Sequence, residues 1–484
     1  MPARYIRHSQ EPSTRDMKAT GEKLKEALTT YLSVLQENRH HVHGHSVYTG
    51  PKGLAVMHHS LSSLPTIRSI VHAKALDYIR DTISLSTGSM QKLFEQSIDP
   101  ARVAFLETQT GLCVLLISHI DDQYLSDQPF SFCVDQLQNV IHTISRQEDD
   151  SDDGTEVLYG RAGFLYGLLL MKNAVSSRGW TRSNGSSIPA QEKLLHLVSN
   201  DSLSVVIRSI IKRGEIGASS YALGVVPIRE RDTLTPPLMW SWHGKRYLGA
   251  AHGVVGILHV LLLCPITLIQ DYLPEILETV EWLITRQDSE GNWPIKAPPL
   301  SQSSIDPSSR SEEHNELVQW CHGAPGSLLL LSRVIRLNHL DATTFSIAPS
   351  TQARIASALR AGASIVYRHG LLRKGIGLCH GVAGSIYALL AVADAMALSP
   401  DDGNKRDSQY YFCRAAHLAE LATEFETFTR EGRMKVPDRP LSLFEGLAGM
   451  CCAWGEICDR IERASDESKN WYRHRSGMPG YDDI

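Results

Sequence analysis

The sequence predicts an all-α fold, a seven-fold α/α toroid in which a double layer of helices carries glycine-rich loops at one end. Three observations lead to this prediction. A Gly-x-x-Gly pattern followed by an apolar, helix-like stretch recurs seven times. Longer amphipathic stretches separate the copies, and no run of alternating polar and apolar residues marks β-hairpins.

The second glycine of the pattern locates each copy along the chain. A glycine pair just before a helix permits a tight turn and a close approach of the backbone. The apolar run that follows is expected to pack inside. The second glycines are Gly53, Gly111, Gly163, Gly256, Gly326, Gly384 and Gly449.

The stretches between the copies supply the second helical layer. Residues 274–287 and 353–370 have apolar residues at helical spacing, as an amphipathic outer helix requires. One inner and one outer helix per repeat, seven times over, closes naturally into a ring. An open solenoid of helical hairpins is the alternative, but such an array needs polar caps and none is evident.

We expect three segments: a flexible N-terminal segment at 1–20, a single toroid domain at 21–470 and a C-terminal tail at 471–484. Within the toroid, the acidic stretch at 146–156 is expected to be a solvated loop. The Ser/Pro-rich stretch at 298–316 reads as a disordered excursion or a lid.

Composition limits the class of protein and its compartment. The 484 residues carry a net charge of -5, so no basic excess points to nucleic acid. No signal peptide is apparent, and the nine cysteines are expected to be reduced thiols of a cytoplasmic protein. The apolar run from Val254 is interrupted by His259 and Pro265, which favours a buried helix over a membrane span. No sequence feature supports membrane association, and none excludes it. A protein that forms a closed ring is expected to be a monomer.

Two copies of the pattern place a cysteine and a histidine side by side, in "WCHGAPG" and "GLCHGVAG". Zinc prefers thiolate and imidazole ligands, and Cys321, Cys379 and His380 would leave the fourth position of a tetrahedral ion open. The toroid would bring the loops of successive repeats close together. On spacing alone, two buried thiols at helix starts are an equal alternative.

Five motifs together, "WCHGAPG", "GLCHGVAG", "YLGAAHGVVGI", "LYGRAG" and "SLFEGLAG", resemble the LanC-like family, the eukaryotic relatives of bacterial lanthionine cyclases. The resemblance extends over nearly the whole chain. It implies a seven-fold toroid that holds one zinc ion through Cys321, Cys379 and His380. It also implies that the metal activates a thiol, with glutathione as co-substrate, for addition to dehydroalanine or dehydrobutyrine in a peptide or protein.

The resemblance also assigns roles to three other loop residues. His252 is the expected acid/base residue, with a structural helix-start histidine as the alternative. His322 is expected to orient the substrate or contact the enolate oxygen, or else to support the metal ligands. Glu156 lies where bacterial relatives have an aspartate. It would hold His252 in one tautomer, unless it is a solvated residue of the acidic stretch.

Glutathione has two carboxylates, so its site is expected to contain cations. Lys374 matches a glutathione-contacting lysine of the family, and Arg4 matches an N-terminal arginine. Lys435 stands where relatives carry arginine, which keeps the charge and loses the bidentate fork. For each, a solvated surface cation is the alternative.

The second copy departs from the family pattern. Eukaryotic relatives usually read F-L-C-G-D-A-G, whereas this chain has "FLETQTG", with Thr108 and Gln109 in place of glycine and aspartate. Substrate identity is therefore less certain than the metal site.

Other functions stay open. A protein that binds zinc and glutathione as a scaffold would need the same ligands, and a peptide cyclase would need a dedicated precursor. An α/α-toroid carbohydrate-active enzyme needs a carboxylate pair, for which the loops offer only Glu156 and Glu445.

Overall fold

The computed structural model describes most of the chain, and the account below concerns those residues. They are residues 3–8, 16–44, 46–71, 78, 98–119, 128–147, 151–177, 189–223, 235–298, 317–340, 342–398, 402–464 and 477–484. The Ser/Pro-rich stretch lies outside them except for Pro298, and residues 148–150 of the acidic stretch also lie outside.

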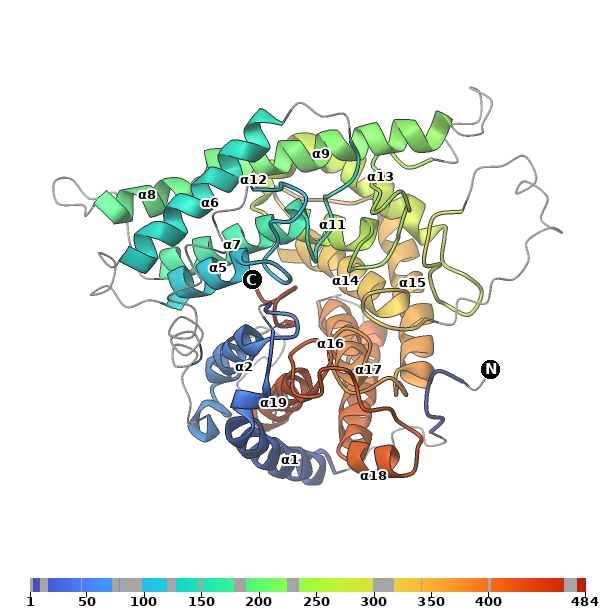
Figure 1. Cartoon of the computed structure of the whole chain (residues 1–484). Coiled ribbons are helices and arrows are strands. Elements are labelled where there is room, and N and C mark those ends of the chain that lie inside the picture. The colour runs from blue at the N-terminus through green and yellow to red at the C-terminus, as the bar shows by residue number, and fades with distance from the viewer. Residues whose placement is uncertain are drawn as a thin grey trace.

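Seven inner helices form a closed ring, and each carries one of the second glycines near its start. Each inner helix contacts the next, and the last contacts the first, so the predicted toroid is confirmed and the open solenoid is excluded (Figure 1). These helices are α2 (Pro51–Ser63), α5 (Thr110–His119), α7 (Arg161–Ser177), α11 (Val254–Leu261), α14 (Ala324–Leu340), α16 (Val382–Ala397) and α19 (Leu447–Ala464).

An outer layer of helices alternates with the inner layer along the chain and packs around it (Figure 1). Between 16 and 464, the described residues contain no β-strand, and the β-pairing among them is limited to isolated bridges. The outer helices are α1 (Met17–Glu37), α6 (Gln128–Arg146), α9 (Asn200–Leu223), α13 (Leu273–Ile284), α15 (Pro349–His369) and α17 (Asp402–Ala422). The shorter elements are α8 (Pro189–Leu197), α12 (Ile266–Ile269), α18 (Phe425–Arg430), η1 (Arg39–His41), η2 (Arg68–Ile70) and η5 (Gln270–Tyr272).

Sequence pattern decides which layer a helix joins. All residues of α16 from Val382 to Met396 are buried, because an inner helix has neighbours on every side. Outer helix α13 buries the residues on one face and exposes those on the opposite face. The apolar run from Val254 forms α11, whose eight residues are all buried, as predicted. The stretch Gln191–Leu223 is apolar and long enough to cross a bilayer, but half of it is buried against its neighbours, as in a core helix.

Close backbone packing explains why the second glycine recurs. At all seven positions a Cβ would lie 1.9 to 2.5 Å from the carbonyl oxygen of the residue six positions earlier. At Gly256, for example, it would lie 1.9 Å from the Ala250 oxygen. Each loop therefore folds back over the first turn of its own helix, and only glycine leaves room for it.

Backbone hydrogen bonds link most neighbouring loops before the inner helices. The Cys379 N–H donates to the Phe444 carbonyl, and the Phe444 N–H donates to the Tyr48 carbonyl, which links the last repeat to the first. The residue four positions before each second glycine then has an equivalent place in every loop. We call these residues the mouth ring: Thr49, Glu107, Tyr159, His252, His322, His380 and Glu445.

The described part of the predicted tail, residues 477–484, lies inside the ring near its centre (Figure 1). Tyr481 is fully buried, with its ring centroid 4.4 Å from that of His259 and 5.0 Å from that of Trp320. Because Trp320 precedes Cys321, this segment supports the floor of the loop that carries one predicted zinc ligand.

Candidate functional site

Two buried thiols lie side by side below the mouth ring. Cys321 and Cys379 are 7% and 3% exposed, and the Cys321 N–H donates to the Cys379 carbonyl oxygen at 3.4 Å. Burial raises the pKa of Cys379 well above its usual value, and the hydrogen bond with the Cys321 thiol raises it further. The predicted pair of sulfur ligands is therefore brought together by the folding of successive repeats.

His380, the third predicted ligand, lies in the same loop as Cys379. Its Nε2 is 3.7 Å from Glu445 Oε1, while its Nδ1 is buried and has no hydrogen-bond partner. An unpartnered imidazole nitrogen beside two thiols fits the donor set that zinc prefers. Among the described residues, however, no three His, Cys, Asp or Glu side chains are gathered closely enough to form a preformed metal cluster. The donor types fit zinc, but the ligands do not surround a common point.

Tyr48 contacts the thiol pair, and the sequence alone did not identify it. Its hydroxyl hydrogen-bonds with the Cys379 thiol, and its ring stacks on Phe444 at 4.7 Å. Burial raises the pKa of Tyr48 well above its usual value, so the phenol is neutral at physiological pH. The position of Tyr48 directly before the mouth ring, equivalent to Cys321 and Cys379, was the available indication.

His252 and Glu156 form a hydrogen-bonded pair at the mouth. Glu156 Oε2 lies 3.0 Å from His252 Nδ1, and the carboxylate also accepts the backbone N–H groups of Leu158 and Tyr159 at 2.7 and 2.6 Å. The Glu156 side chain is fully buried, which excludes the solvated alternative. A carboxylate only accepts, so in the neutral ring the proton stays on Nδ1 and Nε2 is left with a lone pair.

Two aromatic rings lie parallel to the His252 imidazole and restrain its orientation. The Trp242 ring is parallel to it at 5.7 Å, and the Tyr159 ring is parallel at 6.3 Å. Trp242 precedes a tight turn at His243, which has a positive φ of 49°. The sequence pattern gave no indication of these rings.

The acidic stretch, which we expected to be a solvated loop, anchors the turn that carries Trp242. Asp152 accepts hydrogen bonds from Ser241 Oγ and Arg246, both at 2.8 Å, and Asp153 accepts the His243 N–H at 3.0 Å. The expectation of a plain solvated loop is therefore wrong for these two carboxylates.

His322 lies between the thiols and His252. Burial, together with the nearby His252 and Lys374, lowers its pKa to about 4. The ring is therefore neutral at physiological pH, and its buried Nδ1 has no hydrogen-bond partner. A neutral imidazole with an unpartnered nitrogen can bind a substrate group there.

The three predicted substrate-binding cations come together from distant parts of the chain. The Arg373 N–H donates to the Arg4 carbonyl at 3.0 Å, and the Lys435 N–H donates to the Arg373 carbonyl at 2.7 Å. Arg4, Lys374 and Lys435 are exposed on the surface. Lys374 acts electrostatically on His322 and on Glu445, which places it on the side that faces the thiols.

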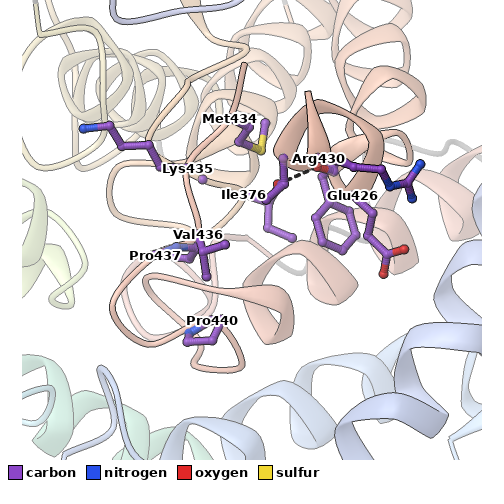
Figure 2. Close-up of a pocket in the computed structure, with 11 residues that line it drawn as sticks. Ile376, Glu426, Arg430, Met434, Lys435, Val436, Pro437 and Pro440 are labelled. Carbon is purple, nitrogen blue, oxygen red and sulfur yellow. Dashed lines mark hydrogen bonds between the residues drawn. The ribbon is translucent and has the colours of Figure 1, made fainter. Parts of the chain in front are cut away.

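An apolar cavity of about 360 Å³ lies beside these cations, between α18 and the 434–440 segment (Figure 2). Ile376, Met434 and Val436 contribute to its lining. Figure 2 shows the Lys435 side chain extending to the side opposite Glu426 and Arg430. The cavity therefore lies next to the cation cluster, with Lys435 in its lining.

Comparison with known proteins places the chain in a family. Residues 41–467 match the family described as lanthionine synthetase C-like protein. The chain belongs to this family. The LanC-like chain is 25% identical over 409 residues, 83% of its length, to a protein of Danio rerio named glutathione S-transferase LANCL1, of which 79% is covered. It is also 25% identical over 364 residues to the LanC-like protein GCL1 of Arabidopsis thaliana, with 74% and 69% of the two chains covered.

A solved structure has the same fold. Nisin cyclase superposes on the LanC-like chain with a TM-score of 0.53 and 15% identity, covering 95% of this chain and 98% of that one. This similarity of fold supports the toroid, which the contacts between the inner helices define independently.

Proposed function

We propose that this LanC-like protein forms thioethers, adding a thiol, glutathione, to dehydroalanine or dehydrobutyrine residues of a peptide or protein. The observation that carries the proposal is the hydrogen bond between His252 and the buried Glu156, with His252 in the same mouth ring as His380 and near the Cys321–Cys379 pair. The name of the Danio rerio relative and the exposed cations Arg4, Lys374 and Lys435 support glutathione as the thiol.

Cys321, Cys379 and His380 would hold one zinc ion, and bound zinc would lower the pKa of a substrate thiol so that thiolate forms at neutral pH. The donor types of the three residues support this assignment, together with the unpartnered Nδ1 of His380.

The reaction balances as the addition of S–H across a carbon–carbon double bond. The sulfur bonds to the β-carbon, the π electrons move onto the carbonyl as an enolate, and the α-carbon then takes a proton. His252 Nε2 would receive the proton of the thiol and return it to the α-carbon, while Glu156 fixes the ring. His322 would donate a hydrogen bond to the enolate oxygen. No oxidant or reductant is needed.

A scaffold that binds zinc and glutathione without turnover is the second candidate. It would need the same zinc and glutathione ligands, so only turnover separates it from the enzyme. A carbohydrate-active enzyme is disfavoured, because Glu156 and Glu445 each pair with a histidine and so offer no free carboxylate pair.

Mass spectrometry of a dehydroalanine peptide incubated with zinc-loaded protein and glutathione tests the proposal. We expect a mass gain of one glutathione with the wild type, and none above background with Cys379→Ala or His252→Gln. Cys264→Ala removes a buried thiol far from the mouth and is the matched control. If zinc and glutathione bind but no adduct accumulates, the scaffold is the correct function and the enzyme is not.

A further inference from the structure

Glu107 belongs to the mouth ring of this chain, in the second copy, where the pattern departs from the family. Its N–H donates to the Leu158 carbonyl at 3.2 Å, which fixes its loop against the loop of Tyr159. The thiols belong to the fifth and sixth loops, and the second loop is three places from each around a ring of seven. Glu107 therefore lies across the mouth from Cys321 and Cys379.

The other carboxylates of the mouth each lie against a histidine, and Glu107 does not. Glu156 is 3.0 Å from His252, and Glu445 is 3.7 Å from His380. Glu107 is half-buried and hydrogen-bonds with Ser46, and the described residues give it no ion-pair partner. Burial, with the charges of Glu445 and Glu156, raises the pKa of Glu107 to about 7, although the hydrogen bond with Ser46 and the charge of Arg102 act to lower it.

A cation of the chain itself already sits beside this carboxyl. The Arg102 guanidinium lies over the Tyr159 ring, 4.9 Å from its centroid, and acts electrostatically on both Glu107 and Tyr159. Arg102 is exposed, so it can leave. A carboxylate next to an aromatic face is a favourable environment for a guanidinium or an ammonium.

We infer that Glu107 and Tyr159 bind a basic side chain of the peptide substrate, with Arg102 occupying its place when no peptide is bound. The inference rests on the proposed function and narrows it to peptides with lysine or arginine next to the dehydrated residue. The cations Arg4, Lys374 and Lys435 would bind the acidic thiol substrate, glutathione. The acidic and the basic substrate would therefore bind at different places in the site, each next to residues of opposite charge.

Binding can be measured without turnover, by fluorescence anisotropy of labelled peptides with alanine in place of dehydroalanine and arginine or glutamine beside it. We expect the wild type to bind the arginine peptide about three- to fivefold more tightly, as a partly exposed ion pair allows. Glu107→Gln should remove this preference, and Arg102→Gln should increase it. Glu278→Gln, an exposed change on outer helix α13, should leave it unchanged.

The preference should grow as the pH rises through about 7, because the Glu107 carboxyl then ionises. Equal binding of the two peptides by the wild type, or a preference that survives in Glu107→Gln, overturns the inference. Adduct formation with dehydroalanine peptides is measured separately. An adduct without a charge preference refutes only the inference, and a charge preference without an adduct refutes only the enzymatic function.

Discussion

At the scale of single residues, the mouth ring places three histidines at equivalent positions of consecutive loops. The groups around each imidazole ring then give the three histidines different chemical properties. His252 has a carboxylate on Nδ1, His322 is neutral through burial, and His380 faces Glu445. In the proposed function the same side chain would serve as a proton carrier, a hydrogen-bonding group or a metal ligand, according to what lies against its ring.

Glu156→Gln tests the pairing with His252. Glutamine is isosteric but can present an N–H to His252 Nδ1, which removes the preference for one tautomer. We expect kcat to fall about 10- to 100-fold, with little change in the KM for glutathione, because proton transfer rather than binding is affected. The measurement is steady-state kinetics of adduct formation, with thermal unfolding as a check on folding. An equal loss in Glu278→Gln would contradict a specific role.

Cys379→Ser tests the metal assignment. We expect zinc content, measured by elemental mass spectrometry after dialysis, to fall from about one ion per chain to background, because a hydroxyl is a poor ligand for zinc. Cys264→Ser changes another buried thiol and should keep the metal. Full zinc occupancy in Cys379→Ser would refute the assignment of Cys379 as a ligand.

At the scale of elements, each loop lies directly on the first turn of its inner helix, and this contact determines both the glycines and the site. Gly256→Ala would place a Cβ 1.9 Å from the Ala250 oxygen of its own loop and 2.8 Å from a Val157 methyl of the preceding repeat. We expect the free energy of unfolding to fall by about 3 kcal/mol or more, measured by urea denaturation.

Gly21→Ala in outer helix α1 is the matched control for the glycine change. Its Cβ would meet only the Ile461 side chain, at 3.2 Å, and alanine favours the helix by up to about 1 kcal/mol. We expect its stability to stay within about 1 kcal/mol of the wild type. Similar losses in both variants would show that close packing of the loop is not the reason for the repeated glycine.

The inner helices could be predicted because the repeated glycine reflects the same contact in every repeat, that of the loop with the first turn of its helix. The seven glycines predicted the inner helices, and the paired Cys-His-Gly loops together with the family resemblance predicted the contact between Cys321 and Cys379. Tyr48 and Trp242 could not be predicted in the same way. Tyr48 reaches Cys379 only because the first loop lies next to the last, and Trp242 depends on an anchored turn without a counterpart in other repeats.

At the scale of the whole molecule, the interior of the ring is filled by the chain's own residues 477–484. The Tyr166 hydroxyl donates to Asp483, and Asp482 lies 3.2 Å from His259, with both of these side chains fully buried. Burial lowers the pKa of His259 well below its usual value, so the imidazole is neutral and does not offset the two carboxyls. Sequence patterns could not reveal this arrangement, because the segment is too short to show a period.

Asp483→Asn tests the electrostatic consequence of this burial. Burial raises the pKa of Asp483 from 3.8 to about 6, so the native state binds its proton more tightly than the unfolded state does. The stabilisation is complete below pH ~4 and is lost as the pH rises through about 6, with a magnitude of about 3 kcal/mol at most. In urea denaturation, the wild type should lose this stability relative to Asp483→Asn between those pH values. Parallel curves would exclude a buried, titrating Asp483.

The contact between α19 and α2 has a consequence for synthesis on the ribosome. A linear array of repeats can fold progressively as it emerges, since each repeat needs only its predecessor. Here the first inner helix lacks one neighbour until the last has been translated, which takes roughly 20 to 80 s at about 5–20 residues per second. During that interval its apolar face is open to other chains, so the nascent protein should depend on chaperones far more than its finished form, in which the last helix to be made covers the first.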